Sequence, residues 1–487
     1  MGGLLSSSLV NSKHIVNNVT QFVIGGKRKR VETESDEEIN KVIDLALHTP
    51  KRKKLVTTAQ YIYQTLYEEG KNSDLTVEAL GHQFHLHRIY LCQSPYFASM
   101  FGGAWLEYDK KYVVIDIIDP QITIDSLKIV FGSLYNDEIT LNPTEIVPIL
   151  ASATMFQLDS IIDKCREVMI ETINPKSAML YYNAACQYAD KKLQETCMQW
   201  FLVNLMTFYY YGSLCYLRTI PIPLMTRLVA NPDLFVVQTE FSLYVMLKFW
   251  MYMHVHPDLT SDPSIKDINT FYSSRTDENP YLLTKQGEDF ILAFQGLRVH
   301  NLISHHMDVE AVQRDNIIPR SWLNPAVLKQ WKIMLKVNQN EDKGPSGELV
   351  DELFLSKSLR CGRILNEKDR HMWRWTGFHY GMDLLMVTDG ASLSIKRNHR
   401  PEFEQLLSFQ TVRRLAIRVT VATLNEQRQM LFRQTTGIKS VSLSKTEELQ
   451  LMTFDKDITF PLIISANILF TSPEDVVTQD AVTQTTH

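Results

Sequence analysis

The chain lacks the cysteine spacing and the catalytic motifs that mark most metalloproteins and enzymes. Its 487 residues include only 6 cysteines, and no two of them form a Cys-x-x-Cys pair. A P-loop, a GxSxG elbow, an HExxH helix and a dinucleotide fingerprint are also absent. We therefore expect no catalytic residue, no metal and no cofactor. Because no signal peptide is apparent, the cysteines are expected to be reduced thiols in the cytosol or nucleus.

The chain also has no hydrophobic run long enough to cross a bilayer. Its most apolar stretch, residues 460–470, is too short and contains Ser465 and Asn467. This stretch predicts a buried strand instead. Membrane contact is expected only through a lipid anchor.

No excess of positive charge is present, since the formal net charge is -5. Basic residues gather in one C-terminal region, but acidic residues are interspersed among them. They are residues 396, 397, 400, 413, 414 and 418. Strands usually place charges on their solvent face, so nucleic-acid binding is not expected.

What is present is the composition of a globular protein, with 45% hydrophobic and 22% charged residues. The length predicts about three domains. Residues 1–56 and 476–487 differ from the rest and are expected to be disordered tails. The intervening periodicities predict an α+β protein.

The N-terminal tail carries three short signals. Met1 to Ser6 fits the acceptor pattern for N-myristoylation at Gly2, although so short a pattern also occurs by chance. Two basic runs are typical of nuclear-import signals, or alternatively of a solvated tail. Their residues are Lys27, Arg28, Lys29, Arg30, Lys51, Arg52, Lys53 and Lys54. Ser35, within the acidic segment 32–38, is a candidate phosphorylation site whose added charge would lie beside the basic runs.

The stretch 81–101, GHQFHLHRIYLCQSPYFASMF, is the most informative part of the chain. It begins with a strand pattern in which Phe84 and Leu86 alternate with polar residues. Ser94 and Pro95 then form the start of a helix, because serine caps helices well and proline suits the first helical position. Phe97, Met100 and Phe101 follow at helical spacing.

Regular patterns surround this stretch. A helix is predicted at 61–70, strands at 75–80 and 112–118, and helices at 123–135, 143–155 and 158–171. This order, with the segments NSDLTV and HRIYLCQSPYFASMF, resembles the BTB (POZ) domain. We assign residues 57–171 to it.

The resemblance implies protein–protein assembly. BTB domains commonly dimerise through their first helices and strand, here roughly 57–100. Members that recruit cullin-3 carry a hydrophobic-x-Glu motif after the third helix, and Trp105, Leu106 and Glu107 occupy that place. An exposed tryptophan is a common interface anchor. Alternatively, Trp105 packs against its own domain.

Three histidines in this region are candidate metal ligands. They are His82, His85 and His87, and no further ligand completes a tetrahedral set at ordinary spacing. Half-buried structural histidines are the better interpretation.

Residues 172–335 show almost only helical periods. The segment 232–252 resembles the BACK domain, with Leu234, Glu240 and Trp250 at its recurring positions. Residues 241, 244, 245 and 249 form an apolar stripe that predicts one buried helix face. The polar segment 259–280 is expected to be a surface insertion.

Beyond a predicted linker at 336–359, the period changes to two. Asp389-Gly390 predicts a hairpin, and residues 415, 417, 419 and 421 alternate as in a strand. Residues 360–475 are therefore expected to form a β-rich, sandwich-like domain that binds the substrate. No repeat of about fifty residues is present, which excludes a kelch propeller. Ser442 to Lys445 fits SxxK without companion motifs, so the match is attributed to chance.

Trp373, Arg374 and Trp375 are candidate substrate-binding residues. In an extended segment the two tryptophans share one face and the arginine lies on the other. The alternative, which we favour, is that the tryptophans belong to the core of the sandwich.

The order of these modules resembles the germ cell-less family of BTB–BACK proteins. The segments that carry the resemblance are TPKRKK, YIYQTL, IYLCQS, FGSLY, RCGR and WRWTGF. The family implies a non-catalytic substrate adaptor of a cullin-3 ubiquitin ligase that functions at the nuclear envelope and in germ-cell formation. The implied partners are cullin-3, a second copy of the chain, a protein substrate and proteins of the nuclear envelope.

The implied location is the nucleus and the periphery of the inner nuclear membrane, with the cytoplasm or cell membrane as further sites during mitosis. A scaffold at the nuclear envelope without ligase activity, or a transcriptional corepressor, is the alternative function.

Overall fold

The computed structural model describes most of the chain between residues 57 and 471. The described ranges are 57–102, 110–136, 138–210, 214–259, 261–339, 341, 350–374, 380–399, 401–455 and 458–471. They belong to two compact units that divide between Glu69 and Gly70. Gly2, both basic runs, Ser35, residues 105–107 and Trp375 lie outside the described residues.

The described part of the first unit is one helical segment, α3 (Thr58–Ile62) continued by the π-helical turn η1 (Tyr63–Glu68). Thr57 starts it with a capping box. The Thr57 hydroxyl accepts a hydrogen bond from the amide of Gln60, and the Gln60 side chain accepts one from the amide of Thr57, both at 3.1 Å. Two amides that would otherwise lack partners are satisfied in this way.

The second unit begins with a small mixed sheet of order β2-β1-β3, in which β1 pairs antiparallel with β2 and parallel with β3. Its elements are β1 (Leu75–Ala79), β2 (His82–Leu86), α4 (Arg88–Leu91), α5 (Pro95–Phe101), β3 (Tyr112–Ile115), α6 (Ile124–Gly132), α7 (Ile146–Met155) and α8 (Asp159–Thr172). These bounds confirm the predicted order of strands and helices, with β3 shorter than expected.

The start of α5 is as the sequence predicts. Ser94 caps the helix by accepting a hydrogen bond from the amide of Phe97, and its hydroxyl donates to the carbonyl of Phe156 at 2.6 Å. The Phe97 ring is fully buried and stacks on Phe156, with 5.3 Å between centroids. Phe131 packs against both rings. One serine therefore connects the helix cap to the aromatic core.

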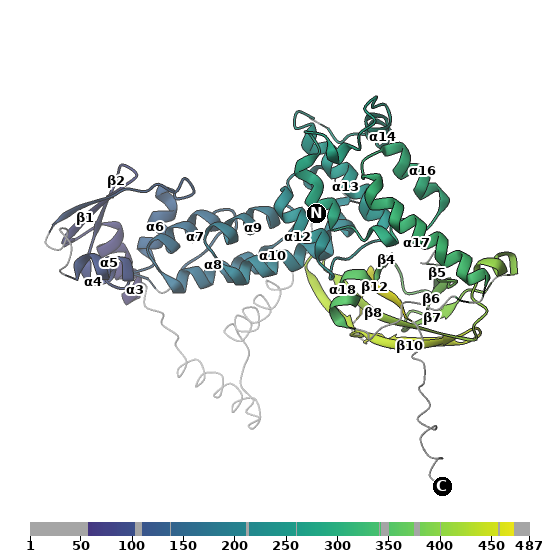
Figure 1. Cartoon of the computed structure of the whole chain (residues 1–487). Helices are drawn as coiled ribbons and strands as arrows, with labels where there is room; N and C mark the ends of the chain where they lie inside the picture. Colours follow the sequence, from purple (N-terminus) through teal and green to yellow (C-terminus); the bar gives the residue numbers. More distant parts are fainter. Residues whose placement is uncertain are drawn as a thin grey trace, which may run out of the picture. The chain divides into compact units, whose positions relative to one another are not determined.

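A helical region follows and lies beside the β-rich region in Figure 1. Its elements are α9 (Ala178–Gln187), α10 (Lys191–Asn204), η2 (Leu205–Tyr210), α11 (Leu214–Leu217), α12 (Ile222–Ala230), α13 (Glu240–Val255), α14 (Ile265–Ser273), η3 (Tyr281–Leu283), η4 (Glu288–Phe290), α15 (Ile291–Gln295), η5 (Val299–Asn301), α16 (His306–Asp315), α17 (Arg320–Asn338) and α18 (Asp351–Lys357).

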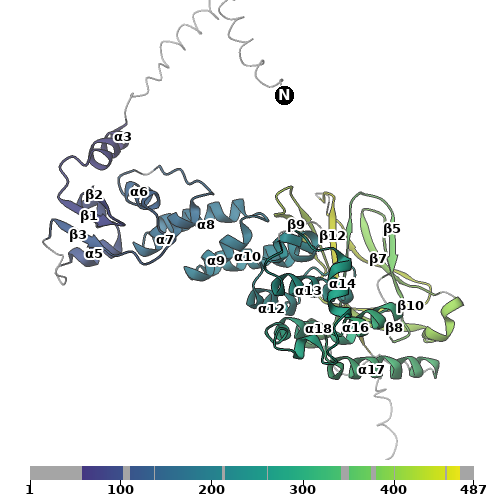
Figure 2. The same cartoon turned by 90° about the horizontal axis from the view of Figure 1, so that it is seen from above.

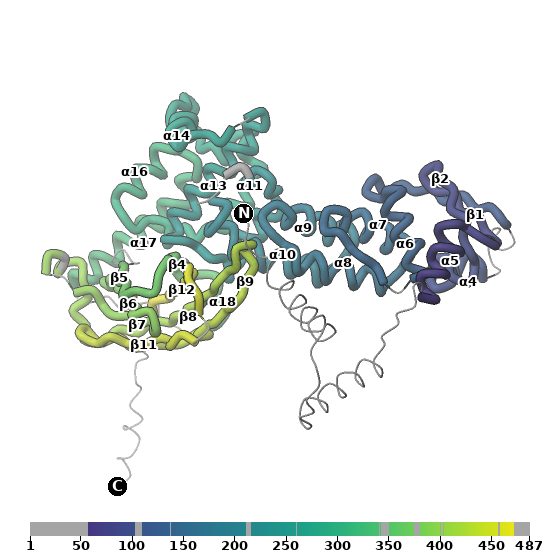
Figure 3. Tube along the Cα trace, turned by 180° about the vertical axis from the view of Figure 1, so that it is seen from behind, coloured from purple at the N-terminus to yellow at the C-terminus, as the bar shows by residue number. Residues whose placement is uncertain are grey.

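Helix α13 is buried on nearly all sides, whereas the sequence predicts a single apolar stripe. Tyr244 and Phe249 of that stripe are buried, but Leu243, Trp250 and the charged Lys248 are buried too. Figure 3 shows α13 among the other helices of the region. A helix covered from several directions carries apolar residues all round, so its periodicity identifies no single face.

The expectation of a surface insertion at 259–280 is wrong in its central part. This segment contains α14, whose Ile268 and Tyr272 are buried. Asn269 accepts a hydrogen bond from Nζ of Lys248 at 2.6 Å, and the same Nζ donates to Asp315 on α16 at 2.7 Å. The sequence of α14 is mostly polar because most of the helix faces solvent, so it did not indicate these buried contacts.

The C-terminal elements form two sheets packed face to face. They are β4 (Leu359–Leu365), β5 (His371–Arg374), β6 (Leu384–Thr388), β7 (Ser392–Arg397), η6 (Pro401–Leu406), β8 (Val412–Leu424), β9 (Met430–Thr435), β10 (Lys439–Ser444), β11 (Glu448–Thr453) and β12 (Leu462–Thr471). One sheet has the order β10-β8-β12-β4 with β9 also pairing with β8, and the other has the order β11-β7-β6-β5. The expected β-rich sandwich is confirmed.

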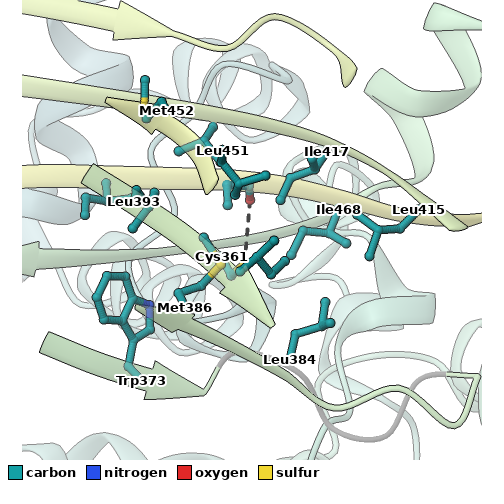
Figure 4. Close-up of a cluster of buried hydrophobic side chains, with 14 of the residues drawn as sticks. Cys361, Trp373, Leu384, Met386, Leu393, Leu415, Ile417, Leu451, Met452 and Ile468 are labelled. Carbon is teal, nitrogen blue, oxygen red and sulfur yellow. Dashed lines mark hydrogen bonds between the residues drawn. The ribbon is translucent and has the colours of Figure 1, made fainter. Parts of the chain in front are cut away.

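The core of the sandwich contains the alternating residues of β8. Leu415, Ile417, Val419 and Val421 all point into it, as predicted. Figure 4 shows Leu415 and Ile417 in this cluster with Cys361 and Met386. The predicted hairpin at Asp389-Gly390 joins β6 to β7, and Gly390 has a φ of 83°, which favours glycine.

The outer face of the five-stranded sheet packs on the helical region. Ala422 and Ile463 of the sheet form a buried cluster with Val203 and Phe235 of the helical region. Residues on both faces of β8 and β12 are therefore buried, which explains the near-continuous apolar run of β12.

Three of the basic residues that the sequence places on a solvent face instead bond to other parts of the folded chain. Arg397 and Arg413 are buried and donate to the carbonyls of Ser408 and Tyr380. Arg418 forms an ion pair with Asp233 at 2.8 Å. These arginines therefore hold the fold together.

The predicted linker at 336–359 is partly helical. Helix α17 continues to Asn338, and α18 places Phe354 in a buried position. Among the described helices, none combines the length and the hydrophobicity needed to cross a membrane.

Candidate functional site

Strand β4 carries the RCGR segment and joins the helical region to the sandwich. Its side chains alternate between the two, because successive residues of a strand point in opposite directions. Leu359, Cys361 and Leu365 enter the core of the sandwich. Arg360 and Ile364 point to the helical region.

Arg360 forms a two-pronged ion pair with Glu240, the first residue of α13. Its Nη2 lies 2.5 Å from Oε1 of Glu240 and its Nε lies 3.0 Å from Oε2. The side chains are 1 % and 0 % exposed, so the pair has no access to solvent. Arg360 Nη1 also donates to the carbonyl of Val229 at 2.7 Å. A buried pair needs such full hydrogen bonding to offset the cost of removing both charges from water.

Arg298 completes this cluster from the loop before η5. Its amide donates to Oε1 of Glu240 at 2.7 Å, and its guanidinium donates to the hydroxyl of Ser358 at 2.8 Å. Burial lowers the pKa of Arg298 to about 9, with Arg360 contributing and Glu240 opposing, so Arg298 remains charged at neutral pH.

Glu240 is the only carboxylate bonded to both arginines among the described contacts. Burial by itself would raise its pKa, but Arg360 and the Arg298 amide and charge outweigh burial and hold the pKa below the ordinary value. Glu240 is therefore ionised at neutral pH.

Gly362 allows the two regions to approach closely. Its carbonyl accepts from the amide of Gln238 at 2.7 Å, and its amide donates to the Gln238 carbonyl at 3.2 Å. A Cβ at this position would lie 2.4 Å from the Val236 carbonyl oxygen and 2.6 Å from that of Ile464. Only glycine fits without displacing backbone on both sides.

A groove of about 500 Å³ opens beside this junction. Its lining consists of Val237, Gln238, Thr239, Gly362, Arg363, Ile364 and Arg374. Arg363 is exposed, and its Cζ lies 5.7 Å from the centroid of the Trp373 ring. Arg374 is partly exposed and forms an ion pair with the buried Asp383 at 2.5 Å. We call this feature the arginine groove. Because Asp383 already compensates the charge of Arg374, the exposed Arg363 is the group that would attract an acidic ligand.

The structure separates the predicted substrate-binding residues. Trp373 is 4 % exposed and packs in the core of the sandwich, near Met386 in Figure 4. Arg374 lines the arginine groove. Trp375 lies outside the described residues. Of the predicted trio, Arg374 is thus the described residue whose side chain reaches the groove.

In the BTB region, His87 has a structural role. Its Nε2 donates to the carbonyl of Lys71 at 2.9 Å, since a carbonyl can only accept. Its Nδ1 then pairs with the Tyr135 hydroxyl at 3.2 Å, which also accepts from the His87 amide. Burial raises the pKa of Tyr135, so its hydroxyl stays protonated.

The other two histidines do not join it. His85 pairs with Thr76 at 3.3 Å, and His82 packs edge-on against Phe84. Within the described residues, no three His, Cys, Asp or Glu side chains are grouped so as to hold a metal ion.

The BTB region also presents apolar side chains to solvent. Ile89 on α4, Tyr112 and Val114 on β3, and Ile118 after β3 are all exposed. Exposed apolar residues that gather on one module are typical of assembly surfaces.

Sequence reasoning missed the cluster of Glu240, Arg298 and Arg360. Glu240 is marked by its sequence context, because it is a single charge at the start of an apolar run. Nothing in the sequence indicates that it meets Arg360, since 120 positions separate them.

Comparison with known proteins agrees with this architecture. The family described as BTB/POZ domain matches residues 63–173. The chain is 41% identical to "Protein germ cell-less" of Drosophila melanogaster over 96% of this chain and 86% of that protein. It is 37% identical to "Germ cell-less protein-like 1" of Homo sapiens over 88% of this chain and 84% of that protein.

A more distant relative matches only part of the chain. "Kelch repeat and BTB domain-containing protein 8" of Xenopus tropicalis is 29% identical over 27% of this chain and 22% of that protein.

Replacing Glu240 by glutamine should strongly destabilise the junction. The change leaves two buried arginines without their counter-charge, and breaking a buried pair in this way costs about 3–5 kcal/mol. Urea unfolding followed by tryptophan fluorescence measures the loss. Glu310→Gln, at an exposed position of α16, is the control and should change stability by less than about 0.5 kcal/mol.

The same pair should contribute to acid unfolding. The pKa of Glu240 is lower in the folded than in the unfolded chain, so its contribution is complete above the unfolded value of about 4.3 and disappears as the pH falls through the folded value. The Glu240→Gln chain should lack this component. Equal stability of both chains at pH 7 would contradict the role assigned to the pair.

Proposed function

Since the chain belongs to the germ cell-less family of BTB-domain proteins, we propose that it is a substrate adaptor of a cullin-3 ubiquitin ligase. In this role the chain contributes no catalytic residue. It raises the local concentration of a client protein at the ubiquitin-transfer machinery that cullin-3 brings. The BTB domain dimerises and binds cullin-3, and the C-terminal sandwich holds the client.

The observation that carries this proposal is the buried ion pair between α13 and β4. An adaptor must hold its client at a fixed distance from the reacting ubiquitin. Glu240, Arg298 and Arg360 join the helical region to the sandwich through bonds that exclude solvent. The packing of Ala422 and Ile463 on Val203 and Phe235 supports the same junction.

The proposed cullin contact is the segment Trp105, Leu106 and Glu107, which follows α5 in the chain. A tryptophan buries a large apolar area at an interface, and a neighbouring glutamate accepts charge-assisted hydrogen bonds. Exposed Ile89 and Val114 are among the described apolar residues of the same domain that suit assembly.

The proposed client contact is the arginine groove. Arg363 presents an exposed guanidinium group, and such a group binds carboxylates or phosphates in a two-pronged manner. Arg374, which Asp383 holds in place, lines the same groove. This assignment keeps Arg374 from the expected trio, leaves out Trp373 because it is buried, and adds Arg363.

Replacing Trp105 by alanine together with Glu107 by lysine should abolish co-purification of cullin-3. The change removes the apolar anchor and reverses the charge beside it. Pull-down from cell extracts, with the oligomeric state measured by light scattering, tests this. The control variant combines Trp331→Ala with Glu310→Lys, which changes the same residue types at exposed positions of α17 and α16. It should leave cullin-3 binding unchanged.

The same experiment separates the ligase from a scaffold or corepressor. Undiminished cullin-3 binding by the Trp105/Glu107 variant refutes the contact. Loss of binding with every cellular function retained favours the alternative in which the chain is a scaffold at the nuclear envelope.

Replacing Arg363 by glutamate should release clients without affecting cullin-3. Proximity labelling under proteasome inhibition should show clients that are at least fivefold depleted, because the groove then repels acidic ligands. Arg370→Glu, also exposed and in the same domain, is the matched control. An unchanged set of labelled proteins would exclude the arginine groove as the client site.

We further propose that the two N-terminal basic runs direct nuclear import and that acylated Gly2 contributes membrane contact at the nuclear envelope. Alanine at Lys27 to Arg30 and at Lys51 to Lys54 should shift a fluorescent fusion from nucleus to cytoplasm. Gly2→Ala should instead reduce the rim signal alone. Normal nuclear accumulation without both runs would disprove the import role.

A further inference from the structure

Among the residues that the structure describes, helix α17 is held to the protein along one side. Leu323 and Val337 are buried on this side. Between them, Nε2 of Gln330 donates to the carbonyls of His300 at 3.2 Å and Ile303 at 3.1 Å. These contacts fix the rotation of the helix about its axis, so its remaining faces are set as well. Figure 2 shows α17 as a long helix at the edge of the helical region.

A second face of α17 exposes a row of apolar side chains. Leu328 is 67 % exposed and Trp331 is 58 % exposed, and Leu335 follows at the same helical spacing. Val327 and Met334, two turns apart on the same side, are exposed as well. Residues at i, i+3, i+4 and i+7 form one stripe on a helix. Such a contiguous apolar stripe in contact with water is unusual for a soluble surface.

A third face, next to the apolar stripe, carries only lysines as charged residues. Lys329, Lys332 and Lys336 are all exposed and lie at i, i+3 and i+7. The helix contains no Asp or Glu in its 19 residues, although the whole chain has a net charge of -5. The apolar stripe is therefore bordered by a row of positive charge.

A hollow of about 600 Å³ lies against one border of the stripe. Its lining is mainly apolar and includes Ile303, Val309, Trp331, Met334 and Leu406. Trp331 and Met334 thus belong both to the stripe and to the wall of the hollow. A large side chain that crosses the stripe could enter the hollow.

We propose that α17 and this hollow bind an amphipathic helix of a partner protein, with apolar residues facing the stripe and acidic residues facing the lysines. The stripe matches the repeat of a second helix, the lysines select acidic neighbours, and the hollow takes one bulky apolar side chain. A bilayer is a poorer occupant, because a flat acyl surface leaves the hollow unfilled. This binding site is distinct from the arginine groove and does not depend on cullin-3.

The probe is a phage-displayed library of 16-residue peptides selected against the full-length chain. The library holds leucine or phenylalanine at i, i+3, i+4 and i+7 and randomises the other positions. Selected peptides should be enriched in Asp and Glu on one side of the apolar row. Their affinity should fall as the salt concentration rises, because exposed charges are screened.

Two double variants identify the contact. Leu328→Ser with Trp331→Ser removes the apolar anchors, and Lys329→Glu with Lys332→Glu reverses the charge. Each should weaken the leading peptide at least tenfold, and the second should also abolish the salt dependence. These positions are exposed, and an unchanged melting temperature and unchanged cullin-3 binding establish that the chain is intact.

Matched controls lie on other helices. Leu292→Ser, at an exposed position of α15, and Lys191→Glu with Lys192→Glu, on α10, should leave peptide binding unchanged. The proposal is overturned if selection gives no acidic enrichment or if test and control variants bind equally. It is also overturned if the chain binds no peptide but pellets with phosphatidylserine vesicles, and the α17 variants lose this pelleting. The same holds if the chain binds no peptide but self-associates, and the α17 variants lose this self-association.

Discussion

The ion pair between Glu240 and Arg360 is the contact on which the arrangement of the second half of the chain depends. Two opposite charges without access to solvent are stable only when every hydrogen-bonding atom around them is satisfied. Glu240 meets this condition through Arg360 and the amide of Arg298, and Arg360 through Glu240 and the Val229 carbonyl. Sliding β4 along α13 by one residue would leave both charges buried and unpaired. The pair thus selects one register between the helical region and the sandwich.

Several neighbouring features follow from that register. Gly362 can approach Val236 and Ile464 because it has no side chain, and this close approach places Arg363 and Ile364 at the mouth of the arginine groove. The packing of Ala422 and Ile463 against Val203 and Phe235 buries the outer face of the sheet. The arginine groove is therefore a product of the junction, because neither region carries it alone. A client bound there would be held by both regions at once.

The predictions from sequence succeeded where a pattern is local. The cap at Ser94, the hairpin at Asp389-Gly390 and the alternation along β8 depend on residues close together in the chain, and all are confirmed. They failed where neighbours come from elsewhere. The segment 259–280 is mostly polar, so its sequence did not indicate that Ile268 and Tyr272 would be buried against α13 and α16. Arginines that were expected on the solvent face of a strand are buried by other parts of the chain, which the alternation of residues along that strand does not indicate.

The sequence by itself determined the kinds of element, their BTB order and the β-rich sandwich, because periodicity, capping and turn residues act over a few positions. The family was indicated by the resemblance of short segments such as RCGR and WRWTGF. Only the tertiary structure decided that Glu240 meets Arg360, that Trp373 is part of the core while Arg363 is not, and that α17 leaves an apolar stripe beside its lysines. Those outcomes depend on which surfaces the folded chain removes from water. Burial depends on contacts between distant segments, so these outcomes are known only from the folded structure.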